Sequence, residues 1–528
     1  MQAQLLAQRP SSSVEQFQQA VELQARDQNL AAARGYVRAL QLEPGLFEAA
    51  FNLAVLLQKM GQVQEAIACY RQSLHLKPNY GPAWGNLGVA LRETGQNRDA
   101  IDSFRQALRC QPGVPDVLNN LGNALRAEDD PVAALACFRA ALRRTPANAG
   151  IQANLGNVLR EAGRLEEAAA TLRHAIELQP DYADAHWDLA FARLLQGDFT
   201  TGWAEYEWRW RRTDSPPRSF AAPLWCGENL AGQTLLAYAE QGAGDAIQFV
   251  RFVSVLAAQG TRVVLECPRA LAGLFESVAG VQRVIVRGDA LPEFDWQVPL
   301  MSLPHRLGTT LDSIPASVPY LRPPAESQVP LPPPRGNRRA ALRVGLAWRG
   351  NPHHQNDRRR SLPFAALEPL FAVPGVAFYN LQVPPAAEFA GEAAHQDRLH
   401  DLGNLIHNFS DTAALMAQLD LVISADTSVA HLAGALARPV WLLLPFAPDW
   451  RWLLKRNDSP WYPTMRLFRQ PVPGDWTSVV RAVRAALASP WPPPSGREKG
   501  QAPAALGAPS GRYDYDFEAN PGINCGAC

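Results

Sequence analysis

The amino-acid sequence predicts an α-solenoid of helical repeats followed by an α/β region that folds as two halves. Prolines recur at a constant interval through the first part of the chain, which indicates the repeats. After residue 222, short apolar runs alternate with helical segments, a pattern typical of parallel sheets covered by helices. A Pro-rich stretch at 323–339 separates two such regions and predicts a linker.

The repeat has a period of 34 residues, the period of tetratricopeptide repeats, in which each unit is a helix–turn–helix. In the clearest unit, small residues such as Gly88 and Ala100 let the two helices approach closely, and Pro112 ends the second helix. Six such units fit within 11–214, and we assign residues 1–214 to the repeat region. The prolines in phase are Pro10, Pro44, Pro78, Pro112, Pro146 and Pro180.

A column of polar residues has the same period and lies on the first helix of each unit. An Asn side chain has two donors and an acceptor, so such a column can hydrogen-bond an extended polypeptide backbone. The alternative is that these residues only pack between repeats. The region resembles the repeats of the O-linked N-acetylglucosamine transferases, which implies that the column binds polypeptide. Its members are Asn52, Asn86, Asn120, Asn154 and Asp188.

The repeat region closes with the aromatic stretch 201–212, TGWAEYEWRWRR. We expect these rings to attach the last repeat to the next domain; the alternative is a stacking platform for a ligand. The rings are Trp203, Tyr206, Trp208 and Trp210.

Each α/β half has its own set of expected strands. The first half, residues 215–322, has apolar runs at 234–240, 262–267, 283–287 and 294–300. The second half, residues 340–488, has runs at 343–348, 376–382, 419–425 and 440–445. Ligands of such folds bind beyond the carboxyl ends of the strands. Residues 489–528 predict a disordered tail, and its final CGAC has no assigned role.

The turn after the 419–425 strand carries three polar residues, Asp426, Thr427 and Ser428, followed by His431 within the next helix. The amides and positive dipole end of that helix suit an anion such as a diphosphate. We expect His431 to face the cleft between the halves. The alternative is that the three turn residues only cap the helix and that His431 belongs to the core.

This segment resembles the donor-binding segment of the heptosyltransferases, and Gly244–Asp245 in the first half matches their first strand–helix turn. The resemblance covers 222–488 and implies a GT-B fold of two Rossmann-like domains, with the nucleotide-sugar donor on the second and the acceptor on the first. It also implies that Asp245 is the general base, and Glu240 is the second candidate. The other residues of the acceptor-side turn are Gln241, Gly242, Gly244 and Gln248.

A nucleoside diphosphate leaving group requires positive charge. The related families often place a Lys there, whereas this chain offers an arginine run, from which we select Arg360 and Ser361 for the phosphates. The alternative is a solvated basic patch. The GT-B resemblance implies that a helix N-terminus and basic side chains supply this positive charge, so we expect no cofactor and no metal. Cys525 and Cys528 have the spacing of thiolate ligands but no second pair.

The composition restricts the partners and the compartment. Fifty Lys and Arg balance fifty Asp and Glu, so no net field attracts nucleic acid. No apolar run is long enough to span a membrane, and we see no secretory signal. Scattered cysteines fit a reducing compartment, so we expect a cytoplasmic protein.

The sequence therefore predicts a glycosyltransferase of metal-independent, inverting chemistry that acts on a polypeptide recruited by the repeats. One alternative is a non-catalytic repeat scaffold with a degenerate transferase domain. Another is a transferase that acts on lipopolysaccharide or another glycan. Convergence of Asp245, His431 and an arginine across one cleft favours catalysis over the scaffold.

Overall fold

The computed structural model describes residues 12–213, 217–327, 329–333, 342–352, 356–383 and 399–489. The predicted tail beyond Ser489 and residues 334–339 of the predicted linker lie outside these ranges. The described chain divides into two compact units, and the boundary lies between Ala185 and His186.

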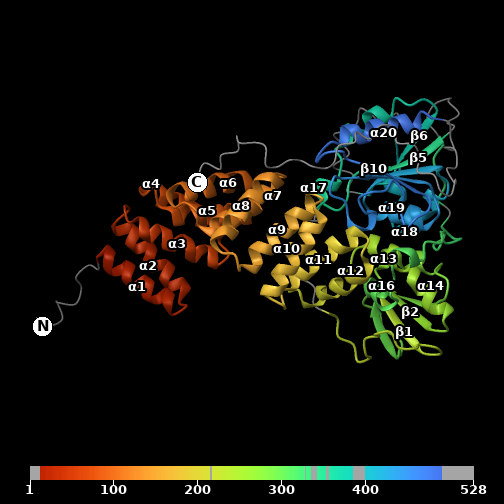
Figure 1. Cartoon of the computed structure of the whole chain (residues 1–528), viewed down its shortest axis with the longest axis horizontal. Coiled ribbons are helices and arrows are strands. Elements are labelled where there is room, and N and C mark those ends of the chain that lie inside the picture. The colour runs from red at the N-terminus through yellow and green to blue at the C-terminus, as the bar shows by residue number, and fades with distance from the viewer. Residues whose placement is uncertain are drawn as a thin grey trace, which may run out of the picture. The chain divides into compact units, whose positions relative to one another are not determined.

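Antiparallel helix pairs form the first unit, as the repeat predicts (Figure 1, red to orange). The chain can reverse between the helices of a pair because glycines such as Gly61, Gly95 and Gly163 adopt positive φ there. The helices are α1 (Ser13–Ala25), α2 (Asn29–Leu42), α3 (Phe47–Lys59), α4 (Val63–Leu76), α5 (Gly81–Glu93), α6 (Asn97–Cys110), α7 (Pro115–Ala127), α8 (Pro131–Arg144), α9 (Ala149–Glu161) and α10 (Leu165–Leu178).

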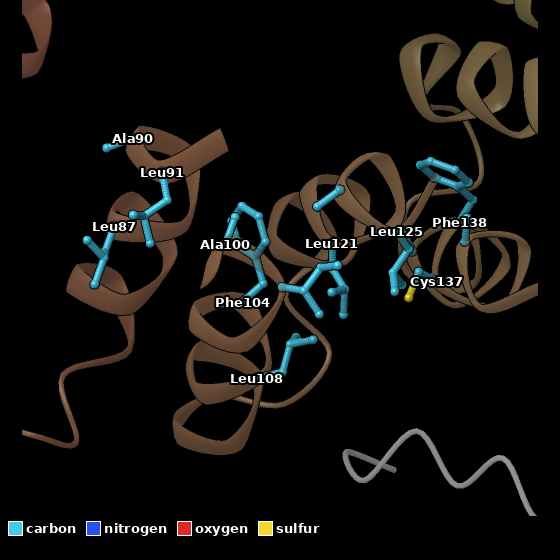
Figure 2. Close-up of a cluster of buried hydrophobic side chains, with 14 of the residues drawn as sticks. Leu87, Ala90, Leu91, Ala100, Phe104, Leu108, Leu121, Leu125, Cys137 and Phe138 are labelled. Atoms are coloured by element: carbon cyan, nitrogen blue, oxygen red, sulfur yellow. The ribbon is translucent and has the colours of Figure 1, made fainter. Parts of the chain in front are cut away.

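Small residues let the two helices of a pair approach. A Cβ atom at Gly88 on α5 would lie 2.6 Å from the Phe104 ring on α6, and one at Gly122 would lie 2.8 Å from Phe138. Figure 2 shows Phe104 and Leu121 among the side chains that fill the space between neighbouring helices. The predicted small residue Gly88 therefore packs against an aromatic ring in the core of the array.

The second unit contains a last helix pair and two parallel sheets (Figure 1, yellow to blue). The pair is α11 (Ala183–Gln196) and α12 (Phe199–Tyr206), followed by the 3-10 helix η1 (Glu207–Arg211). The first sheet has the order β3-β2-β1-β4, with β1 at Thr234–Tyr238, β2 at Arg262–Cys267, β3 at Val281–Val286 and β4 at Trp296–Pro299.

The second sheet has the order β10-β9-β8-β5-β6-β7, and its neighbouring strands pair in parallel. Its strands are β5 (Leu342–Ala347), β6 (Val376–Asn380), β7 (Leu399–Asp401), β8 (Leu421–Ala425), β9 (Val440–Leu444) and β10 (Met465–Arg469). Counted within this sheet, the order is 3-2-1-4-5-6, that of doubly wound nucleotide-binding folds. The order reverses between β5 and β8, and in the first sheet between β1 and β4. Such switch points are where these folds bind ligands.

Helices connect and cover the strands of both sheets. In the first half they are α13 (Ala243–Phe249), α14 (Arg251–Ala258), α15 (Arg269–Phe275) and α16 (Leu303–Arg306). In the second they are α17 (Asp357–Arg360), α18 (Phe409–Met416), α19 (Ser428–Ala435) and α20 (Trp476–Leu487), with the 3-10 helices η4 (Phe364–Leu370) and η8 (Trp450–Trp452). No helix among the described residues combines the length and apolarity needed to cross a membrane.

All of the strands expected from the sequence are present, with ends that shift by up to two residues. The strands β7 and β10 were not predicted. The first spans only three residues at a sheet edge, and arginines interrupt the second, MRLFR. The complete strand order of the second sheet therefore includes two edge strands, β7 and β10, whose apolar pattern is too weak to predict them.

Candidate functional site

The turn between β8 and α19 lies at the switch point of the second sheet. Thr427 is the N-cap residue of α19 but makes no capping hydrogen bond; its hydroxyl lies 3.2 Å from that of Ser424. Ser428 is already the first residue of the helix. Side-chain capping therefore does not account for these polar residues.

His431 is buried against the same turn. Its Nδ1 lies 2.9 Å from the Tyr462 hydroxyl, and its Nε2 lies 4.0 Å from the Asp426 carboxylate. Burial, reinforced by the positive charge of Arg451, lowers the pKa of His431 well below its ordinary value, which favours the neutral imidazole. Burial raises the pKa of Asp426 to about 6, and the nearby Asp449 carboxylate adds to the rise.

Arg360 reaches this turn from the other side of the switch point. Its guanidinium donates to the backbone carbonyl of Asp426 at 3.2 Å and to the Asp357 carboxylate at 3.3 Å. The Ser361 hydroxyl accepts the Gly350 N–H at 3.0 Å and so fixes the loop that carries Arg360. The predicted phosphate residues thus lie beside the predicted donor turn, with the Arg360 side chain partly exposed.

Asp245, at the first turn of α13, has both carboxylate oxygens engaged. Oδ2 accepts the Gly242 N–H at 3.0 Å, as in a capping box, and Oδ1 pairs with Arg451. The side chain remains 24% exposed. Asp245 therefore holds the turn and also links it to η8 of the second half.

Glu240, the second candidate base, lies at the carboxyl end of β1. Unlike Asp245, it has only one carboxylate oxygen engaged in hydrogen bonds among the described residues. One oxygen accepts the Met301 N–H at 3.2 Å and an Arg209 N–H at 3.3 Å. The other, Oε2, is buried with no hydrogen-bond partner among the described residues. Burial raises the pKa of Glu240 to about 7, although Arg209 acts in the opposite direction.

The acceptor-side turn meets the donor-side helix directly. A Cβ atom at Gly244 would lie 3.1 Å from the His431 ring, so the absence of a side chain lets α13 approach α19. Gln248 is fully buried, and its Oε1 accepts the Nε–H of Arg451 at 2.5 Å. Gln241 accepts a hydrogen bond from the Tyr206 hydroxyl at 3.1 Å. Residues predicted for the two sides of the cleft therefore come together.

Two arginines that the predicted site omitted organise it. Arg209 and Arg451 each stand between two tryptophans in a WRW triplet, and each lies in a short 3-10 helix. Arg209 stacks over Trp210 at 4.3 Å, and Arg451 stacks over Trp450 at 4.4 Å. The repeated triplet was the available sequence signal, but only the fold shows that these arginines pair with Glu240 and Asp245.

The aromatic segment that closes the repeats packs as expected. Trp203 is buried and contacts Trp450 with ring centroids 5.1 Å apart, and it also contacts Phe249 at 6.0 Å. Trp208 stacks on His186 at 3.6 Å. The attachment role is confirmed for Trp203, whose ring is enclosed by the α/β halves.

The polar column of the repeats borders a groove of about 240 Å³ in the first unit. Asn86 and Asn120 both line it, next to Gly85 and Val89. Asn154 instead donates to Asn119 at 2.9 Å, which is a contact between repeats.

The remaining members of the column are also placed on the first helix of a pair. Asn52 on α3 interacts with the Tyr36 hydroxyl, and Asp188 on α11 is partly exposed. The described residues contain no group of three or more His, Cys, Asp or Glu side chains placed to hold a metal ion.

Comparisons with known proteins identify the repeats. Tetratricopeptide repeat families match residues 45–113, 86–149 and 156–197. Protein FlbA from Caulobacter vibrioides is 29% identical over 328 residues, which is 57% of this chain and 54% of that protein. The chain therefore spans about half the length of this relative.

Solved structures of repeat proteins also resemble part of the chain. YrrB, described as a tetratricopeptide repeat protein with an unusual peptide-binding site, is 21% identical, covering 35% of this chain and 95% of that one, with a TM-score of 0.31. A tetratricopeptide repeat protein from Parabacteroides merdae is 16% identical, covering 37% of this chain and 77% of that one, with a TM-score of 0.35. The chain contains tetratricopeptide repeats, and these support a role in binding other proteins.

Proposed function

We propose that the chain is a glycosyltransferase of the GT-B type that moves a sugar from a nucleotide-sugar donor to a polypeptide held by the repeats. The observation that carries this proposal is the meeting of the two switch-point turns. Gly244 of the first half contacts α19, the helix that carries His431 in the second, and Asp245 pairs with Arg451 of η8 in that same half.

The donor side offers the chemistry that a diphosphate needs. The amino end of α19 presents backbone amides and a positive dipole end, and Arg360 adds a guanidinium beside it. Both stabilise the charge that develops on the diphosphate oxygen as its bond to the anomeric carbon breaks. The neutral His431 donates or accepts a hydrogen bond at this position without adding charge.

Glu240 has the more suitable hydrogen bonding and pKa of the two candidate bases. A new bond forms between the acceptor oxygen and the anomeric carbon, and the acceptor proton passes to a carboxylate. Asp245 is held by Arg451 and the Gly242 N–H, whereas Glu240 has an oxygen without a partner and a pKa of about 7. A pKa near the working pH suits a general base. One displacement of this kind inverts the anomeric centre.

The charges at the first sheet favour a polypeptide over an anionic glycan as acceptor. Three arginines near its carboxyl edge are matched by carboxylates, since Arg209 and Arg306 pair with Glu207 and Arg218 pairs with Glu266; Arg287, after β3, donates to the Ala239 carbonyl. A surface for an acidic glycan would present unpaired positive charge. The groove beside Asn86 and Asn120 adds a place for an extended chain.

Calorimetry and thermal shift against UDP, GDP, ADP and their sugars test the proposal, with EDTA and with Mg²⁺. We expect saturable binding of one nucleotide by the full chain, and at least tenfold weaker binding by the double variant Asp426→Asn/His431→Gln. The control is His407→Gln, whose side chain is 77% exposed outside the site. Well-folded protein that binds no nucleotide would refute the donor site.

A non-catalytic scaffold is the second candidate, and the ion pair between Asp245 and Arg451 favours it. The resemblance to the heptosyltransferases implies that Asp245 is the general base. The ion pair with Arg451 would then prevent Asp245 from taking the proton of the acceptor. Nucleotide binding without sugar transfer to any added polypeptide, together with retained peptide binding by the repeats, would support the scaffold.

A further inference from the structure

At the positions that line the groove, the last helix pair differs from the repeat of α5 and α6. Gly85, Asn86 and Val89 line the groove of the inner repeats. Three periods of 34 residues further along the chain, the same register positions are Trp187, Asp188 and Phe191. A glycine and a valine are thus replaced by two large aromatic residues in the repeat that packs with the α/β halves.

The two aromatic residues form a cluster with Tyr206. The Trp187 ring lies 5.0 Å from the Phe191 ring and 4.7 Å from the Tyr206 ring, centroid to centroid. Trp187 and Phe191 are partly exposed, whereas Tyr206 is buried. The Arg212 guanidinium faces the Trp187 ring and lies 5.4 Å from its centroid.

This aromatic cluster adjoins the acceptor-side turn. The Tyr206 hydroxyl donates to Gln241 at 3.1 Å, one residue beyond Glu240. Arg209, which has the register position of the groove-lining Ala107, pairs with Glu240 at 3.3 Å. Groove positions of the last repeat therefore contact the same turn that carries the proposed base.

We propose that Trp187, Phe191 and Tyr206 form a subsite that binds an apolar side chain of the acceptor polypeptide, close to the residue that receives the sugar. The inference rests on the proposed function, because it assigns the acceptor of that reaction. A partly exposed aromatic surface stabilises an apolar side chain by removing both from water. The enzyme would therefore select acceptors by a neighbouring apolar residue as well as by backbone contacts.

Peptide binding tests this subsite without requiring activity. The probes are fluorescein-labelled peptides of Gly, Ser and Thr that carry one central Leu or, in the matched peptide, Asn. Fluorescence polarisation with the full chain should give about tenfold tighter binding for the Leu peptide. Trp187→Ala should abolish this preference, and Trp187→Phe, which keeps an aromatic ring, should retain most of it.

Two controls separate the subsite from general damage. Trp296→Ala removes a partly exposed Trp at the amino end of β4 and should leave the preference unchanged. Phe191→Ala repeats the test on a second ring if Trp187→Ala proves unstable in thermal unfolding. Nucleotide binding by the same variants, measured by calorimetry, should be unaffected.

Equal affinity of the unmodified chain for the two peptides would overturn the subsite, and so would a preference that survives both ring deletions. Failure of the folded chain to bind either peptide would overturn it as well. If nucleotide binding and sugar transfer fail while the ring deletions still abolish the Leu preference, the proposed function is wrong but the aromatic cluster is a peptide-binding site.

Discussion

At the scale of single residues, two arginines place two neighbouring carboxylates in different states. Arg451 pairs with Asp245 and also donates to Asp449 at 2.9 Å, so Asp245 is part of an ionic contact between the halves. Arg209 divides its donors among Glu207, Ser302 and Glu240. Glu240 therefore accepts only one of the hydrogen bonds that Arg209 donates, and burial is the main cause of its raised pKa.

The Glu240→Gln substitution should change how stability depends on pH. The pKa of Glu240 is raised from 4.5 to about 7, so an acid that is charged in the unfolded chain stays protonated in the fold. This favourable protonation is fully present below pH 4.5, and its contribution is lost as the pH rises through about 7. The free energy of unfolding falls by about 3 kcal/mol over this pH range. Gln is neutral at every pH, so the variant does not lose this contribution.

The stability of the variant relative to the unmodified protein should therefore improve as the pH rises across this window. Chemical unfolding at several pH values measures it, and Glu276→Gln, an exposed residue at the end of α15, serves as control. A difference between Glu240→Gln and the unmodified protein that does not vary with pH would show that Glu240 ionises normally. The same variant should lose sugar transfer while it retains nucleotide binding.

At the scale of elements, a column of three glycines, Gly88, Gly122 and Gly156, determines how closely the helices of these three repeats pack. Gly88 and Gly85 lie on the same helix, α5, but face different neighbours. A Cβ atom at Gly88 would clash with the buried Phe104 ring at 2.6 Å, whereas one at Gly85 would meet Val117 at an ordinary 3.6 Å.

We therefore expect opposite effects from two identical substitutions. Gly88→Ala should destabilise the array by about 1–3 kcal/mol, because the Phe104 ring must move within a packed core. Gly85→Ala should be neutral or stabilising by up to about 1 kcal/mol, since alanine loses less backbone entropy in a helix. Thermal unfolding of the two variants compares them, and equal effects would contradict the role of the close contact.

Sequence patterns predicted these elements well wherever local chemistry determines them. The proline period and the glycine positions report on contacts within one repeat, so a single sequence is sufficient. The strands β7 and β10 were not predicted from the sequence, because an edge strand of three residues and the alternating MRLFR show little apolar pattern. Their pairing is determined by the sheet they join.

At the scale of the whole molecule, the candidate site depends on contacts between segments that are far apart in the sequence. The turn residues around Asp426 and Asp245 could be predicted because each follows an apolar strand. Arg451 is 206 residues from Asp245 in the chain, and Glu240 is 31 residues from Arg209. No local pattern reports such pairs, so the sequence predicted two turns that the fold brings together but not what binds their side chains.

The last helix pair belongs physically to the α/β unit, and this predicts where the chain can be divided. Sequence patterns change near residue 214, but the compact units separate after Ala185. The reason is packing: Trp203 is enclosed by rings of the α/β halves, and Phe199 stacks near Trp461 at 6.0 Å.

A fragment of residues 183–489 should therefore fold, whereas a fragment of residues 217–489 should be markedly less stable. The shorter fragment loses the Trp203 side chain, whose removal from a core costs about 3–5 kcal/mol, and it exposes Trp450 and Phe249 to water. It also removes Arg209, which leaves Glu240 without its cation. Urea unfolding of the two fragments provides the measurement. Equal midpoints would mean that the last repeat is only attached to the α/β unit, whereas a lower midpoint for the shorter fragment would make that repeat a structural part of the proposed acceptor site.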